Sequence, residues 1–79
     1  MAQTGSSHRD TCARVAAILR SERENRRLSM NQVAERAGIS QQMVSYVERG
    51  MRNPTLDTLL RMSSAIGIDL VDVIRRAQG

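Results

Sequence analysis

The sequence has 79 residues, a formal net charge of +4 and a calculated pI of about 11.0. A chain of this length supports one domain with a single small core. Tyr46 is its only aromatic residue, a composition that disfavours β-sandwiches and β-barrels, so we expect an all-α fold.

The basic residues are all arginine, 12 of them against 8 acidic residues. A basic domain of this kind suits an anionic partner such as nucleic acid. The planar guanidinium group fits phosphate better than an ammonium group does, although codon bias also produces an arginine-only repertoire.

The chain has one cysteine, Cys12, and one histidine, His8. A lone cysteine forms neither an intramolecular disulfide nor a thiolate metal site. His8 lies in a polar stretch and the carboxylates are scattered, so no catalytic group is apparent. No signal-peptide pattern is present, and no apolar run approaches the roughly 20 residues that cross a bilayer. We therefore expect a cytoplasmic protein that is not an enzyme and has no cofactor and no metal.

The N-terminal stretch 1–9 is polar and has no apolar periodicity, which predicts a flexible arm before a domain at 10–79. Asp10 or Thr11 is a suitable N-cap, so we expect the first helix to run from there to about Asn25. Its inner stripe is predicted to consist of Val15, Ile18 and Leu19, with Glu22 at the next position on that face.

Two short helices are predicted next. Ser29 and Gln32 have the spacing of a capping box at the start of one helix, and Gly38 ends it. Ser40 caps the following helix, which ends at Gly50. The inward positions of the pair are Val33, Ala34, Ala37, Ile39, Val44 and Val47. A small residue near a glycine-containing turn is what a helix-turn-helix requires.

The last third of the chain predicts two more helices. Asn53 precedes a proline and disfavours helix, whereas Thr55 caps a helix from Leu56 to Ile66 that Gly67 closes. Its inner face is predicted to be Leu56, Leu59, Met62 and Ile66. After the cap at Asp69, the final helix has more apolar residues than one stripe needs, namely Leu70, Val71, Val73, Ile74 and Ala77. These residues either meet a partner or close the core of the single chain.

The stretch "LSMNQVAERAGISQQMVSYVERGMRNPTLDTLLRMSSAIGIDLVDVI" resembles the lambda-repressor-like, Cro/C1-type (Xre) helix-turn-helix family. The resemblance extends from about Val15 to Ile74 and includes the Glu-Arg-Gly, Arg-Asn-Pro-Thr and Gly-Ile segments. It implies a compact five-helix DNA-binding domain in which helices two and three form the motif. The chain departs from the family at Met30, where Gln is usual, and at Ser63, where Ala is common.

In such a motif, the first residues of the second helix meet base edges in the major groove. Gln41 and Gln42 hold these positions, and a glutamine amide can pair with N6 and N7 of adenine. The alternative is that both are ordinary polar residues on a solvated helix start. Ser45 points the same way and would meet a base or a phosphate. Tyr46 would meet a phosphate or a thymine methyl group, unless its ring packs on the fourth helix.

The resemblance also implies that helix starts and the loop after the recognition helix contact the DNA backbone. The residues at these positions are Ser29, Asn31, Ser40, Arg49, Arg52 and Asn53. Arg23 and Glu48 resemble a structural ion pair of related repressors, so we expect them to hold the fold and not to read bases.

Together these features predict a sequence-specific transcriptional regulator, of the repressor or restriction-modification controller type. We expect it to bind a palindromic operator in double-stranded DNA as a homodimer, and to be nucleoid-associated when bound. The expected dimer interface is Leu70, Val71, Ile74 and Ala77. No membrane contact and no small-molecule ligand are expected. Two alternatives are an antitoxin of a toxin–antitoxin pair and a helical protein-interaction module that no longer binds DNA.

Overall fold

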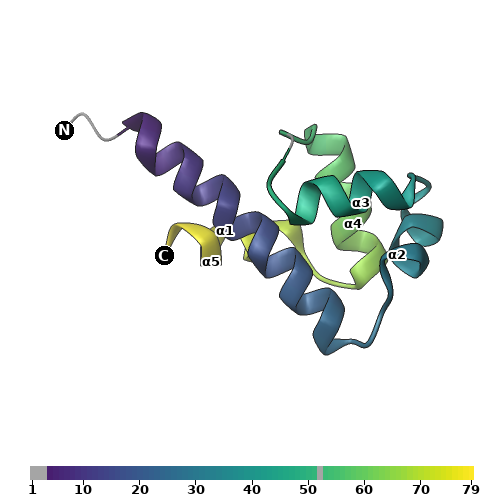
Figure 1. Cartoon of the computed structure of the whole chain (residues 1–79). Coiled ribbons are helices and arrows are strands. Elements are labelled where there is room, and N and C mark those ends of the chain that lie inside the picture. The colour runs from purple at the N-terminus through teal and green to yellow at the C-terminus, as the bar shows by residue number, and fades with distance from the viewer. Residues whose placement is uncertain (1–3, 52) are drawn as a thin grey trace.

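The computed structural model describes the backbone of residues 4–51 and 53–79, with side chains from residue 9 onward in those ranges. The described residues form five helices and no strand (Figure 1), which confirms the all-α prediction. The helices are α1 (Thr4–Asn25), α2 (Met30–Ala37), α3 (Gln41–Glu48), α4 (Leu56–Ile66) and α5 (Leu70–Gln78). No helix in this part of the chain is long and apolar enough to span a membrane.

Polar caps determine where four of the helices begin. Ser29 Oγ accepts a hydrogen bond from the Gln32 N–H at 3.0 Å, and Gln32 Oε1 accepts one from the Ser29 N–H at 2.8 Å. This is the predicted capping box. Ser40, Thr55 and Asp69 cap the following helices through the same kind of side-chain contact. Because each cap satisfies an N–H that the helix leaves unpaired, the starts predicted at these residues are confirmed.

The start of α1 was predicted wrongly, although its end at Asn25 is confirmed. The helix begins at Thr4 and not at Asp10 or Thr11. Once the packed half of a helix has formed, each further turn adds hydrogen bonds without a new nucleation cost, and 4–9 contains no proline to stop it. The predicted division into an arm at 1–9 and a domain at 10–79 therefore does not coincide with the helix start, and it stays a prediction.

The core draws on all five helices. Each helix has at least one side chain that is completely removed from solvent. These are Leu19, Val33, Val44 and Met62 in α1 to α4, and both Val73 and Ala77 in α5. The predicted inner face of α2, formed by Val33, Ala34 and Ala37, is buried as expected. Because the core contains no aromatic side chain, it is filled by aliphatic groups and methionine alone.

Leu56 does not join this core, contrary to the prediction. Its side chain is 63% exposed, whereas Met62 and Ile66 on the same helix are buried and Leu59 is partly buried. Leu56 is the first residue of α4, next to the cap at Thr55, and helical spacing alone does not reveal that this turn lies beyond the packed part of the molecule.

The long helix α1 and the final helix α5 pack against each other (Figure 1). Arg14 Nη1 donates to the carbonyl oxygen of Ala77 at 3.2 Å, which satisfies one of the free carbonyl groups at the end of α5. Arg76 Nη1 donates to Glu22 Oε2 at 3.0 Å across the same pair of helices. This packing leaves α2, α3 and the start of α4 on the other side of α1 (Figure 1).

Candidate nucleic-acid interface

The turn between α2 and α3 is built on Gly38 and Ala34. Gly38 has φ +72°, a left-handed conformation that side chains rarely adopt. Its N–H donates to the Ala34 carbonyl oxygen at 2.9 Å, and the Ile39 N–H donates to the same oxygen at 3.1 Å. Ala34 is buried beneath the turn. The two helices therefore meet through the small residue and the glycine that the sequence singled out.

Helix α4 holds the C-terminal end of α2 through an arginine. Arg61 Nη1 donates to the Ala37 carbonyl oxygen at 3.3 Å, while Arg61 Nε donates to Asp57 Oδ2 at 2.8 Å. A Cβ atom at position 38 would lie 3.4 Å from Arg61 Nη1, so the guanidinium packs closely against the glycine turn. The sequence analysis missed this support, because the Asp57–Arg61 spacing is visible in the sequence but the contact with α2 is not.

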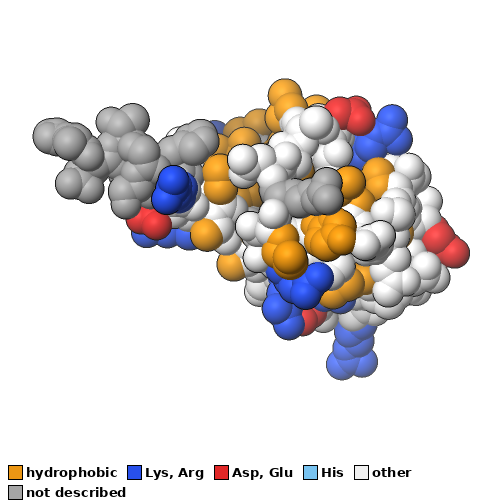
Figure 2. Space-filling model, turned by 45° about the horizontal axis from the view of Figure 1, so that its top comes forward, with side chains coloured by type: hydrophobic (Ala, Val, Ile, Leu, Met, Phe, Trp, Pro, Cys, Tyr) orange, Lys and Arg blue, Asp and Glu red, His pale blue; other side chains and the backbone are white. Residues whose placement is uncertain are grey.

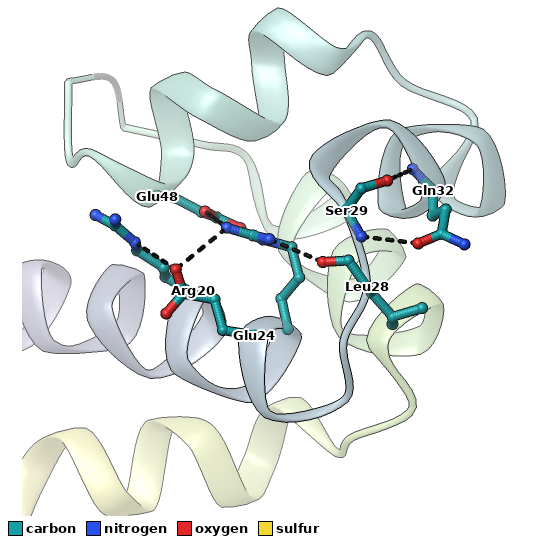
Figure 3. A network of polar contacts seen from close by, with 7 residues as sticks. Arg20, Glu24, Leu28, Ser29, Gln32 and Glu48 are labelled. Atoms are coloured by element: carbon teal, nitrogen blue, oxygen red, sulfur yellow. Dashed lines mark hydrogen bonds and ion pairs between the residues drawn. The ribbon is translucent and has the colours of Figure 1, made fainter.

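A buried ion pair fixes the other end of α3 to α1 (Figure 3). Arg23 Nε and Nη2 donate to Glu48 Oε2 and Oε1 at 2.7 and 3.0 Å, and Arg23 Nη1 donates to the Leu28 carbonyl oxygen at 2.8 Å. Both residues are buried. The hydrogen bonds with Glu48 raise the pKa of the Arg23 guanidinium above its usual value. The two residues that the sequence paired thus join α3 to α1 and to the α1–α2 loop.

The outer face of α3 carries the four residues predicted to read bases. Gln41 and Gln42 are exposed in the first turn, and Ser45 and Tyr46 are partly buried one turn later. Gln42 Nε2 donates to the Tyr46 hydroxyl oxygen at 2.6 Å. Tyr46 thus has a partly buried ring and a hydroxyl group that reaches Gln42. The structure brings these side chains to one face, at the end of α3 next to the turn.

Most residues predicted to contact phosphate are accessible. Ser29, Asn31, Ser40, Arg49 and Asn53 are all exposed, whereas Arg52 lies outside the described residues. The hydroxyl groups of Ser29 and Ser40 already accept helix N–H groups, but a hydroxyl group keeps its own hydrogen for donation. Met30, at the position where the family usually has Gln, is partly buried against the core.

The four residues predicted to form a dimer interface divide into two pairs. Leu70 and Ala77 are buried in the core of the single chain, so they have almost no surface to offer a partner. Val71 is 57% exposed and Ile74 is partly exposed. Leu70 and Ala77 thus belong to the core of the single chain. The dimer interface itself stays a prediction.

Other exposed apolar side chains were missed by the sequence analysis. Met51, Leu56 and Leu60 are each at least half exposed, and Figure 2 shows hydrophobic side chains reaching the surface among arginine and polar groups. Leu60 follows Leu56 by one turn of α4, so the i, i+4 spacing was available as a signal. That spacing does not by itself distinguish an outer face from an inner one.

The comparison with family models decides the identity of this arrangement. The model described as helix-turn-helix matches residues 19–73, which include the turn, the ion pair and all of α2, α3 and α4. The chain belongs to the Cro/C1-type helix-turn-helix family. The family and the relatives below are transcription regulators and not enzymes, in agreement with the sequence-based expectation for this chain.

Several curated proteins are similar to the chain. An uncharacterised HTH-type transcriptional regulator of Mycobacterium tuberculosis is 42% identical over 52 residues, which cover 66% of this chain and 37% of that protein. The chain thus spans well under half the length of this relative. A second such regulator, from Sinorhizobium fredii, is 40% identical over 66% of this chain and 68% of its own length. The immunity repressor protein of Bacillus phage phi105 is 32% identical over 76% of this chain and 42% of its own.

A solved structure has the same fold. The clp gene regulator ClgR from C. glutamicum superimposes with a TM-score of 0.75 at 28% sequence identity, covering 87% of this chain and 86% of that one. The structural match extends beyond the residues matched by the family model, which begin only in the second half of α1. The helix-turn-helix domain is therefore supported both by sequence and by three-dimensional arrangement.

Proposed function

We propose that this chain is a sequence-specific transcriptional regulator whose α3 enters the major groove of operator DNA. The observation that carries this proposal is the pair of exposed glutamines, Gln41 and Gln42, in the first turn of a helix that is anchored at both ends. Because Gly38 orients one end and Glu48 the other, the glutamines are presented on a rigid element, as base recognition requires.

The chemistry of the glutamine amide suits adenine. Its oxygen accepts a hydrogen bond from N6 while its nitrogen donates one to N7, a bidentate contact that contributes about 1–3 kcal/mol of discrimination against other bases. Ser45 adds a hydroxyl group on the same face. We therefore propose an operator half-site that contains adenine at the positions facing α3.

Contacts with the DNA backbone would set the register of the complex. Ser29 and Ser40 lie at helix N-termini, whose free N–H groups attract phosphate oxygens. Asn31, Asn53 and Arg49 add exposed polar or charged groups, and Arg52 belongs to the proposed set by sequence. Such contacts carry no sequence information, but they make affinity fall steeply as salt rises.

We propose that the regulator acts as a repressor, on a palindromic operator and as a homodimer. One domain covers one half-site, and two copies related by a two-fold axis place their recognition helices about 34 Å apart. The similarity to an immunity repressor favours repression over activation. The proposed protein works at DNA in the cytoplasm and requires no cofactor.

Selection from a random duplex library tests the proposal. The wild-type protein is expected to enrich a palindrome, and the Gln41→Ala, Gln42→Ala double variant is expected to lose the preference at the corresponding base pairs while still binding DNA non-specifically. Gln78→Ala, which removes an exposed glutamine at the end of α5, is the matched control. It should enrich the same DNA palindrome as the wild-type protein.

Failure of the proposal has a clear signature in the same experiment. Equal affinity for every duplex, with a salt dependence no different from that of other basic proteins, would support the protein-interaction alternative. Retention of full sequence preference in the double glutamine variant would show that other residues read the operator.

A further inference from the structure

A hydrogen bond on the outer face of α3 restrains one of the two glutamines. Gln42 Nε2 lies 2.6 Å from the Tyr46 hydroxyl oxygen, one helical turn away. Gln41 has no hydrogen bond of this kind to any described residue. The adjacent glutamines, although similar in sequence and exposure, therefore differ in how freely their amide groups can turn.

The bond determines what Gln42 offers to DNA. A glutamine amide has two N–H hydrogens and one acceptor oxygen. One N–H is donated to Tyr46, which leaves the oxygen and the second N–H for a ligand. An acceptor and a donor side by side are the complement of adenine N6 and N7 in the major groove.

We propose that Tyr46 is a positioning residue, which fixes the Gln42 amide in the orientation that accepts adenine and rejects guanine. The proposal rests on the proposed function, since it assigns a role within base reading by α3. Guanine presents two acceptors, O6 and N7, in the same place. A fixed amide places its acceptor oxygen next to guanine O6, and the two acceptors repel each other. An amide that is free to rotate can instead donate an N–H to O6.

Replacement of Tyr46 by Phe isolates this role, because it removes the hydroxyl group and keeps the ring. The Tyr46→Phe variant is expected to lower the preference for adenine over guanine at a single base pair in each half-site by about three- to tenfold, the effect of one ordinary hydrogen bond. That base pair should be the one whose preference is abolished by Gln42→Ala. The thermal midpoint of unfolding should change little, because the bond lies on the exposed surface.

Affinities for duplexes that differ only at that base pair give a double-mutant cycle. Wild type, Tyr46→Phe, Gln42→Ala and the double variant are compared, with Gln78→Ala on α5 as the control outside the proposed DNA-binding face. If Tyr46 acts through Gln42, the phenylalanine substitution changes nothing further in the Gln42→Ala background. Gln78→Ala should leave the preference at this base pair unchanged.

Other roles for Tyr46 give different results. If the ring reads a thymine methyl group directly, Tyr46→Phe leaves the whole preference profile intact. A phosphate contact through the hydroxyl group would make all duplexes weaker by the same factor. Either result overturns the positioning role while Gln42→Ala still shows base reading, and a wild-type protein without any preference would instead refute the proposed function itself.

Discussion

Ser63 carries a buried hydroxyl group that has no hydrogen-bond partner among the described residues. A buried polar group without a partner costs about 1–3 kcal/mol, and serine is also a poorer helix former than alanine. We therefore expect Ser63→Ala to raise the free energy of unfolding by about 1 kcal/mol. For a domain of this size, that corresponds to a rise of about 4–8 °C in the thermal midpoint, measured by circular dichroism.

The neighbouring serine provides the control for this prediction. Ser64 is exposed on the same helix, so Ser64→Ala changes helix propensity without removing a buried hydroxyl group. Ser64→Ala should raise the free energy of unfolding by only a few tenths of a kcal/mol. Equal gains from the two substitutions would mean that burial of the Ser63 hydroxyl group carries no cost. The sequence marked Ser63 as a departure from the family, but its burial without a partner follows only from the packing of α4.

At the scale of elements, the ion pair between α1 and α3 is the contact with the largest expected effect. Glu48→Ala would leave the buried Arg23 guanidinium without the carboxylate that it hydrogen-bonds, with only the more distant Glu24 at 3.8 Å, and such a loss costs about 3–5 kcal/mol. We expect this variant to lose most of its stability in urea denaturation. Replacement of both residues by apolar groups, as in Arg23→Met with Glu48→Leu, should recover much of the loss because no buried charge remains.

The exposed residue Glu35 supplies the comparison for Glu48. It lies on α2 and no ion pair involves it among the described residues. Glu35→Ala should therefore shift the urea midpoint only slightly. If Glu48→Ala lowers the free energy of unfolding by less than about 1 kcal/mol, the Arg23–Glu48 pair contributes no more than a surface salt bridge does.

The ion pairs of Glu22, with Arg26 one helical turn away and with Arg76 of α5, should make stability depend on pH in the acidic range. Hydrogen bonds from Arg26 and Arg76 lower the pKa of Glu22 below its usual value of 4.5. Because the folded pKa is the lower one, the stabilisation is fully present above the unfolded pKa and is lost as pH falls through the folded pKa. Glu22→Gln should therefore destabilise the protein by about 1 kcal/mol near neutral pH and by progressively less below pH 4.5.

Thermal midpoints measured across this pH range test that prediction. Glu24→Gln is the control, since Glu24 is about half exposed and its pairs with Arg20 and Arg23 both lie within α1. The thermal midpoints of the wild type and of Glu24→Gln should differ little at every pH. A Glu22→Gln penalty that persists undiminished at low pH would contradict the assigned cause.

The sequence predicted the elements well because their limits are set by local contacts. The caps at Ser29, Ser40, Thr55 and Asp69 and the glycines that end α2 and α4 are all recognised from residues a few positions apart. Contacts between distant elements were less accessible. Neither the Arg61 contact with the end of α2 nor the exposure of Leu56 follows from spacing along one helix. The Arg23–Glu48 pair was anticipated only through family resemblance.

At the scale of the whole molecule, the proposed homodimer is expected to use the exposed apolar residues of α5. Val71→Glu should lower the dimer fraction in sedimentation equilibrium and leave the unfolding midpoint nearly unchanged, because Val71 is 57% exposed. By contrast, Leu70→Glu should unfold the chain, since Leu70 is buried in the core.

Leu60 provides an alternative surface for the same measurement. It is 50% exposed on α4, so Leu60→Glu should be tolerated by the fold. A dimer that is broken by Leu60→Glu and not by Val71→Glu would move the interface from α5 to α4. If the protein stays monomeric at all concentrations without DNA, two copies would associate only when they bind the two half-sites of the operator.

Every helix contributes at least one fully enclosed side chain, and this has a consequence for motion. Leu19, Val33, Val44, Met62 and Val73 are all inaccessible to solvent, so no helix can detach without exposing the shared interior. The amide protons of α3 that are hydrogen-bonded within the helix should then exchange with deuterium only when the entire chain opens. A regulator constructed in this way would leave DNA as an intact body, and it would not release the duplex by melting its recognition helix.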